Sequence, residues 1–195
     1  ADPRPRLATV GLIDPFAYMH GDVETRFAKK RFWRPVIQIE DEPPQAFRSW
    51  LQRRSNPKLL IASQTRVIEC FADELGETLP STPLITVTPR QDKRLWHLMA
   101  ALASPAASAW AVAAAAGTGL SRETVRLRAS LLAELPLPAP STRWDEGADL
   151  ARRIQSGDRD RNTIMQFGEA MNTAYMTASE ELLTWWMDRI QKKRP

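Results

Sequence analysis

The chain has a single cysteine and no long apolar run. Cys70 is the one cysteine among 195 residues, so no disulfide can form within the chain. A lone thiol close to the apolar residues Ile68 and Phe71 is typical of a protein kept in a reducing compartment, and the sequence predicts a cytoplasmic location. The longest nearly apolar run, residues 106–116, is alanine-rich and much shorter than the ~20 residues that cross a bilayer. No leader pattern is visible either, so we expect no membrane partner.

Signatures of common enzyme classes are also missing. Gly117 and Gly119 lack the third glycine and the Lys-Ser/Thr pair of a phosphate-binding loop. Of the two histidines, His97 lies in a helical apolar pattern, where a structural role is commoner than metal binding. No lysine follows an acidic residue by two positions, a spacing common in metal-dependent nucleases, and no Asn/Asp-Pro-Pro-aromatic loop for a flipped base occurs. We therefore expect no catalytic residue, metal or cofactor in this chain.

The proline content divides the chain into two parts. Residues 1–139 hold most of the prolines and the short β-branched runs, whereas residues 142–194 contain no proline. Prolines at residues 135–140 mark the boundary, because proline removes donors and keeps the backbone extended. Five strands are predicted, at residues 7–12, 35–39, 58–62, 66–71 and 84–88. We expect an α+β fold, with a mixed or antiparallel sheet and packed helices, followed by a small helical C-terminal lobe over residues 142–195.

Helices are predicted where apolar residues recur every three to four positions, at residues 95–102, 105–116, 144–154, 164–175 and 182–190. The second of these has Ser104 as its N-cap and Pro105 in its first turn, and stops at Gly117. Its alanine face permits close packing, which we expect to be against the sheet. Thr177 and Glu180 predict a capping box for the last helix.

Cations gather in three groups within a net charge of +4. Lys and Arg are interleaved with Phe and Trp over residues 26–34, and further groups lie at residues 48–58 and 122–128. Fixed cations neutralise phosphates, and arginine can bind a guanine edge with two hydrogen bonds. Residues 64–66 follow an apolar strand directly, which places groups that bind adenine or guanine at a strand end. The candidate DNA contacts are Lys29, Lys30, Arg31, Arg34, Lys58, Gln64, Thr65, Arg66, Arg122, Thr124, Arg126 and Arg128.

Several short motifs follow one another over residues 7–139, at residues 9–15, 57–66, 83–87, 102–105, 117–120 and 135–138. Their order and approximate spacing resemble the C-terminal specificity region of N6-adenine DNA methyltransferases from restriction-modification systems, of the TaqI-type and type I-like kinds. In that family a strand led by Lys precedes a short strand and loop, and a Leu-Pro-x-Pro run follows the last recognition segment. The chain has Ala103 where the family often has Asn.

The resemblance implies that this chain recognises DNA and that a separate catalytic domain, in cis or in trans, transfers the methyl group. Residues 1–139 would form a target-recognition domain that grips double-stranded DNA and reads base edges, and residues 142–195 a helical extension. The catalytic domain would bind S-adenosylmethionine and the flipped adenine. By itself the chain is expected to be inactive, with Lys58, Gln64 and Arg66 in the matched strand and loop.

Other functions stay open from the residues alone. Each basic group also fits a solvated surface with buried aromatics, and the polar residues 64–66 fit an ordinary turn. Trp185, Trp186 and the alanine face could instead form a protein-interaction module that docks a methyltransferase or restriction subunit. A divergent nuclease is the third and weakest interpretation.

Overall fold

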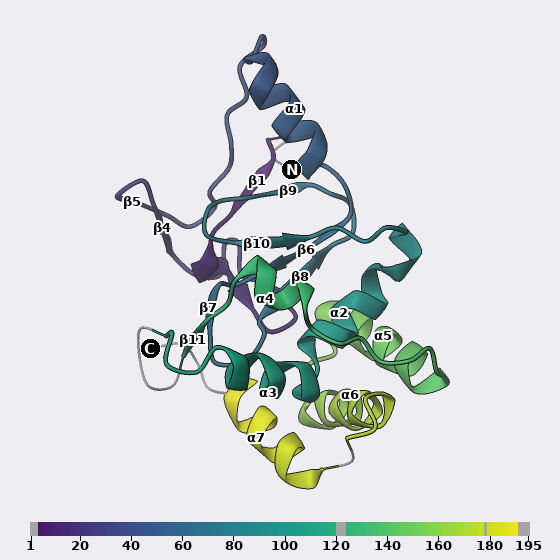
Figure 1. Cartoon of the computed structure of the whole chain (residues 1–195). Helices are drawn as coiled ribbons and strands as arrows, with labels where there is room; N and C mark the ends of the chain where they lie inside the picture. The colour runs from purple at the N-terminus through teal and green to yellow at the C-terminus, as the bar shows by residue number, and fades with distance from the viewer. Residues whose placement is uncertain (1–3, 120–123, 178, 191–195) are drawn as a thin grey trace.

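A three-stranded antiparallel sheet lies at the centre of the structure. Its middle strand β6 (Lys58–Ile61) is flanked by β8 (Cys70–Asp73) and β10 (Ile85–Val87). Figure 1 shows this sheet between the N-terminal strands and a group of helices that ends with α7. The α+β class predicted from the sequence is confirmed. The computed structural model describes residues 4–119, 124–177 and 179–190.

Both faces of β6 are buried. Leu59 and Ile61 belong to the main hydrophobic core on the helical side, whereas Leu60 lies with Ala8 and Ile13 on the other side. Successive side chains of a strand point to opposite faces, so a strand covered on both sides needs an unbroken apolar run. This requirement explains why the sequence after Lys58 is continuously apolar and does not alternate.

Short strand pairs surround the central sheet. One is a separate parallel pair, between β1 (Arg6–Ala8) and β9 (Thr78–Pro80). Of the two predicted alternatives, a mixed or an antiparallel sheet, the central sheet is the antiparallel one. A 3-10 helix, η1 (Val10–Leu12), takes the place of the second half of the first predicted strand. The antiparallel pairs are β2 (Ile13–Asp14) with β3 (Ala17–Tyr18), β4 (Thr25–Phe27) with β5 (Lys30–Phe32), and β7 (Gln64–Thr65) with β11 (Val125–Arg126).

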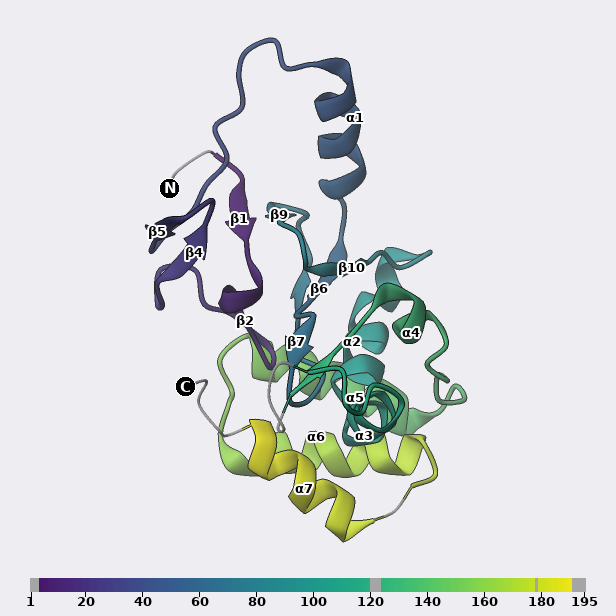
Figure 2. The same ribbon diagram turned by 60° about the vertical axis from the view of Figure 1, so that its left-hand side comes forward.

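The helices of the first two thirds of the chain differ in their burial. α1 (Gln45–Arg54) has no buried residue and extends away from the sheet in Figure 2. After η2 (Asp92–Arg94), α2 (Leu95–Ala103) packs on β6 and β8. α3 (Pro105–Ala114) starts as predicted, because Ser104 Oγ accepts a hydrogen bond from the Ala107 amide at 3.1 Å. The predicted contact of its alanine face with the sheet was wrong: α3 packs chiefly on α2, α6 and α7, since α2 already covers the sheet.

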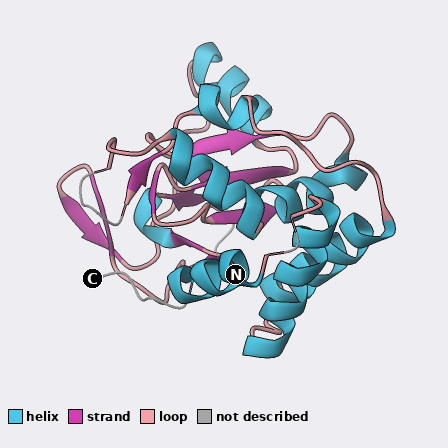
Figure 3. Cartoon of the chain, turned by 60° about the horizontal axis from the view of Figure 1, so that its bottom comes forward, coloured by secondary structure: helices cyan, strands magenta, loops and turns pink. Residues whose placement is uncertain are grey.

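The C-terminal helices continue the same core. Trp144, Phe167 and Trp186 lie in one cluster with Leu59 and Ile61, so residues on both sides of the predicted boundary at 139–142 share a hydrophobic core. Figure 3 shows the helices packed beside the strands. The helices after residue 128 are α4 (Ala129–Ala133), α5 (Thr142–Gln155), α6 (Arg161–Ala174) and α7 (Glu180–Ile190).

A side-chain amide joins α5 to the sheet. β8 is an edge strand, so part of its backbone has no strand partner. Gln155 at the end of α5 accepts a hydrogen bond from the Ala72 amide and donates one to the Ala72 carbonyl, both at 2.8 Å. The carboxamide therefore takes the place that a residue of a fourth strand would have.

Three local predictions differ from the structure. Residues 35–39 form only an isolated bridge between Val36 and Arg6, because Pro35 and Pro5, which accept the flanking hydrogen bonds, have no N–H to extend the ladder. The strand predicted at 66–71 starts at Cys70, because the Ile68 amide bonds to Ser108 Oγ of α3 at 3.1 Å. Ser179, and not Thr177, caps α7 through the Leu182 amide at 3.1 Å.

Among the residues that the structure describes, no single helix is both long enough and apolar enough to cross a membrane.

A substitution of Trp186 tests whether α7 belongs to the shared core, because among the described residues Trp186 is the largest fully buried side chain. Trp186→Ala should lower the free energy of unfolding by about 3–5 kcal/mol, measured by urea titration. Trp33→Ala is the control, since Trp33 is 57% exposed, and it should change that free energy by less than about 0.5 kcal/mol. Equal small effects would contradict a core that includes α7.

Asp160 is the N-cap of α6, and its hydrogen bonds should make the stability of the protein sensitive to acid. Hydrogen bonds from the Thr163 hydroxyl (2.6 Å), the Thr163 amide (3.1 Å) and the Asn162 amide (2.8 Å) hold its pKa at about 2. Its proton binds less readily in the folded state than in the unfolded chain, so this stabilisation is fully present above about pH 4 and is lost as the pH falls through about 2. Asp160→Asn keeps a capping oxygen but not this titration. Its urea midpoint should fall less than that of the wild type between pH 4 and 2, and parallel losses would count against the assignment.

Candidate nucleic-acid interface

The ribbon of β7 and β11 brings together two predicted contacts from distant parts of the chain. Arg126 lies directly opposite Gln64 in the antiparallel register. The pairing continues beyond the strands, because the Leu127 amide donates to the Ser63 carbonyl at 2.8 Å. Side chains of directly opposed residues lie on the same face of a ribbon. The exposed Arg126 guanidinium and the half-buried Gln64 amide therefore share one face.

Burial alternates along the β11 segment as the sequence predicts. Val125 and Leu127 are buried in the main core, whereas Arg126 and Arg128 are exposed. Arg128 immediately precedes α4, and the Arg126 amide donates to the Thr118 hydroxyl at 3.0 Å. Arg126 and Arg128 thus lie on either side of Leu127, on a backbone that the buried side chains of Val125 and Leu127 fix to the core.

Thr65 does not belong to the exposed face of the ribbon. It is opposite Val125 and is 2% exposed, and its hydroxyl donates to the Val67 carbonyl. The prediction of Thr65 as a DNA contact is therefore corrected to an internal role in the turn after β7. Thr124 and Arg66 are half-buried next to the ribbon. Arg122 lies outside the described residues.

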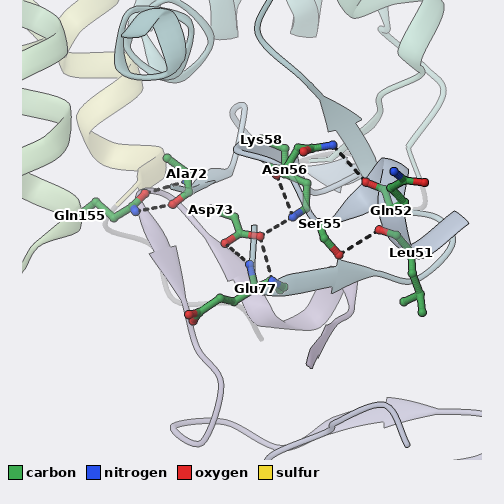
Figure 4. Close-up of polar contacts among 10 residues, drawn as sticks. Leu51, Gln52, Ser55, Asn56, Lys58, Ala72, Asp73, Glu77 and Gln155 are labelled. Carbon is green, nitrogen blue, oxygen red and sulfur yellow. Dashed lines mark hydrogen bonds and ion pairs between the residues drawn. The ribbon is translucent and has the colours of Figure 1, made fainter. Parts of the chain in front are cut away.

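Lys58 is likewise corrected from a DNA contact to an internal ion pair. Only 1% of its side chain is exposed, and its ammonium group is paired with Asp73, which lies opposite it across the β6–β8 ladder. Figure 4 shows the same carboxylate accepting hydrogen bonds from the amides of Glu77 (3.1 Å) and Thr78 (2.9 Å). Lys58 also donates to the Asn56 carbonyl at 3.3 Å. A cation with these partners cannot reach a phosphate without breaking the core.

The electrostatics of this pair follow from its burial. Burial lowers the pKa of Lys58, and the hydrogen bond and charge of Asp73 oppose that change. Asp73 at the same time fixes the turn from β8 to β9, where Gly76 has a φ of +72°. A Cβ on Gly76 would meet the backbone of Ser55 and Asn56, so glycine permits the close approach of the chain after α1.

The β4–β5 hairpin carries the other predicted contacts. Lys29, Lys30, Arg31 and Arg34 are all exposed. Arg31 pairs with Glu24 at 3.1 Å, in a bridge open to solvent that contributes little to stability. Figure 1 places this hairpin and the β7–β11 ribbon along the same side of the molecule. The exposed members of the predicted set thus fall on the β7–β11 ribbon with Arg128 after it, and on the β4–β5 hairpin with Arg34 after it.

The remaining polar features act within the fold. His97 bonds to the Asp145 carboxylate at 2.9 Å, and the Trp144 indole donates to the His97 carbonyl at 2.9 Å. These contacts join α2 to α5. Over the described ranges, no group of three or more His, Cys, Asp or Glu side chains is placed to hold a metal ion.

One largely apolar groove lies between α3, residues 135–139 and the end of α6. Its volume is about 560 Å³, and Trp110, Leu137 and Tyr175 are among the residues that line it. Met176, at the rim, is 91% exposed. The groove was not among the sites predicted from the sequence, whose signal was limited to the Leu-Pro run.

No protein-family model matches the chain, and no curated protein matches it.

The internal ion pair gives a stability test. Asp73→Ala leaves the Lys58 ammonium buried without a counter-charge and should lower the free energy of unfolding by about 3–5 kcal/mol. The double variant Lys58→Met/Asp73→Leu removes both charges and should recover part of that loss, because the amides of Glu77 and Thr78 still lose their acceptor. Glu146→Ala breaks an exposed pair with Arg143 and serves as the control, with a change below about 1 kcal/mol. Urea unfolding measures all three, and an Asp73 variant as stable as the control would refute the internal role.

Proposed function

We propose that this chain is the DNA target-recognition part of an N6-adenine DNA methyltransferase of a restriction-modification system. The observation that carries the proposal is the pairing of Gln64 and Arg126 on one exposed ribbon face. In the resemblance to that family, Gln64 belongs to the motif at residues 57–66, and Arg126 lies in the segment before the Leu-Pro run at residues 135–138. The structure brings them to adjacent positions.

The two side chains suit base recognition chemically. A Gln carboxamide can donate and accept at the adenine N6 and N7 edge, and an arginine can donate twice to guanine O6 and N7. Recognition also requires that such groups are held in place before binding, because ordering a long side chain and its backbone costs free energy. Here Val125, Leu127 and Thr65 anchor the ribbon in the core, so only the side chains remain to be ordered.

Methyl transfer belongs in this proposal to residues outside the chain. The sequence lacks the Asn/Asp-Pro-Pro-aromatic loop that holds a flipped adenine. S-adenosylmethionine and the target base would be bound by a catalytic domain in cis or in trans, and double-stranded DNA is the shared partner. The chain alone is then a binding module without activity.

A docking function is the second candidate, and the burial of the C-terminal tryptophans favours a different surface for it. Trp186 is fully buried, and Trp185 is half-buried with the Arg189 guanidinium 4.5 Å from its ring. These tryptophans therefore contribute to the chain's own packing. The groove rimmed by the exposed Met176 and Leu137 is a better surface for a catalytic or restriction subunit.

The proposal predicts a loss of sequence discrimination in ribbon variants. Gln64→Ala and Arg126→Ala should each reduce discrimination between the target duplex and a duplex altered at one base pair by about 1–3 kcal/mol. Fluorescence anisotropy with the intact methyltransferase measures both affinities, after sequencing of its methylated DNA has identified the target.

Arg143→Ala is the matched control, since it removes one exposed arginine from α5, where the proposal places no base contact. It should leave discrimination unchanged. Wild-type protein that binds no duplex, or ribbon variants that discriminate as well as the control does, would contradict the proposal.

A further inference from the structure

The β4–β5 hairpin is built as an exposed arm. Its two-residue loop, Ala28–Lys29, has positive φ values of 48° and 64° at both positions. That conformation matches the twist of a tight hairpin, but it is normally adopted by Asn and Gly. The loop therefore turns the chain within two residues and leaves Lys29 exposed at the tip of the arm.

The two faces of the arm differ. Thr25, Phe27, Lys30 and Phe32 share one face by alternation, and Thr25 anchors it, being 6% exposed with its hydroxyl 2.5 Å from the Thr9 hydroxyl. The opposite face carries Arg26 and Arg31, which are direct cross-strand partners and are both exposed. Thus Thr25 ties the base of the arm to the body, while Phe27 and Phe32 on its face and the two arginines on the other face are exposed.

A direct Arg–Arg pair is unfavourable for the hairpin itself. Opposed residues have Cβ atoms about 4.5–5.5 Å apart, where like charges destabilise the pair. Glu24 bonds to Arg31 at 3.1 Å, but within the described residues no ion pair includes Arg26. Residues 22–34 contain five cations, at positions 26, 29, 30, 31 and 34, against two acids, at positions 22 and 24. The fold alone gives no reason to keep these charges together.

We propose that the arm binds the phosphate backbone of the duplex beside the site read by the β7–β11 ribbon, with Arg26 and Arg31 as the central phosphate contacts. The inference rests on the proposed function and assigns it a second, sequence-independent element. Phosphates one nucleotide apart on a strand supply closely spaced negative charges, which relieve the repulsion between the two guanidinium groups. Phosphate contacts fix position on the duplex, and base contacts give specificity. The arm and the ribbon would divide these two tasks.

Salt dependence separates this role from base recognition. The intact methyltransferase carrying Arg26→Ala/Arg31→Ala should bind target and non-target duplexes more weakly by the same factor. Its slope of log affinity against log salt should become shallower by about 1.8, because each phosphate contact contributes about 0.9. Arg26→Lys/Arg31→Lys keeps the charges and should restore most of the slope. The double alanine variant should fold normally, since it removes a repulsive pair, and circular dichroism checks this.

Arg143→Ala/Arg153→Ala is the matched control, because it removes two exposed arginines from α5 and should leave the slope unchanged. If the wild type shows no salt-dependent duplex binding, the proposed function fails together with the arm. If the wild type binds specifically but the arm variant keeps its slope, only the arm inference fails. An arm variant that loses discrimination, or loses the catalytic subunit and not DNA, also overturns the phosphate role.

Discussion

The central constraint is that a sheet of only three strands is buried on both faces. Leu59 and Ile61 need the cover of α2, and Leu60 needs the cover of the N-terminal segment. Even the charged residue at the start of β6 is drawn inside, where Asp73 neutralises it and the amides of two further residues complete the carboxylate's hydrogen bonds. The central sheet therefore offers no open face to a ligand, and exposed functional groups must lie on segments that leave it.

Two ribbons meet that requirement in different ways. The β7–β11 ribbon is fixed to the main core by the buried side chains of Val125 and Leu127. Gln64 and Arg126 therefore extend from a backbone that the core holds in place. The β4–β5 arm is fixed mainly at its base, through Thr25, and carries its charges outward. Under the proposed function, the rigid, sparsely charged ribbon would read bases, and the exposed, strongly charged arm would neutralise phosphates. The C-terminal helices belong to the same structure, because Gln155 bonds to β8 and Trp186 lies in the core that holds Val125 and Leu127.

The sequence predicted local features better than tertiary ones. Ser104 and Pro105 at the start of α3, and the apolar faces of α5 and α6, depend on spacings of a few residues and are confirmed. Lys58 and Thr65 were wrong as contacts, because their partners are fixed by strand register and turn geometry that no local pattern encodes. The adjacency of Gln64 and Arg126 was likewise invisible, although each was a candidate. β8 starts later than predicted because the Ile68 amide donates a hydrogen bond to Ser108 Oγ, and Ser108 is forty residues further along the chain.

Amide hydrogen exchange is the decisive measurement, made on the methyltransferase that would contain this chain under the proposed function, with and without duplex DNA carrying its target site. We expect slower exchange on DNA binding in β7, β11 and the β4–β5 arm, with α5 and α6 unchanged, because the proposed DNA contacts lie on the ribbons that leave the sheet. Slowing confined to the C-terminal helices, with both ribbons unaffected, would contradict it.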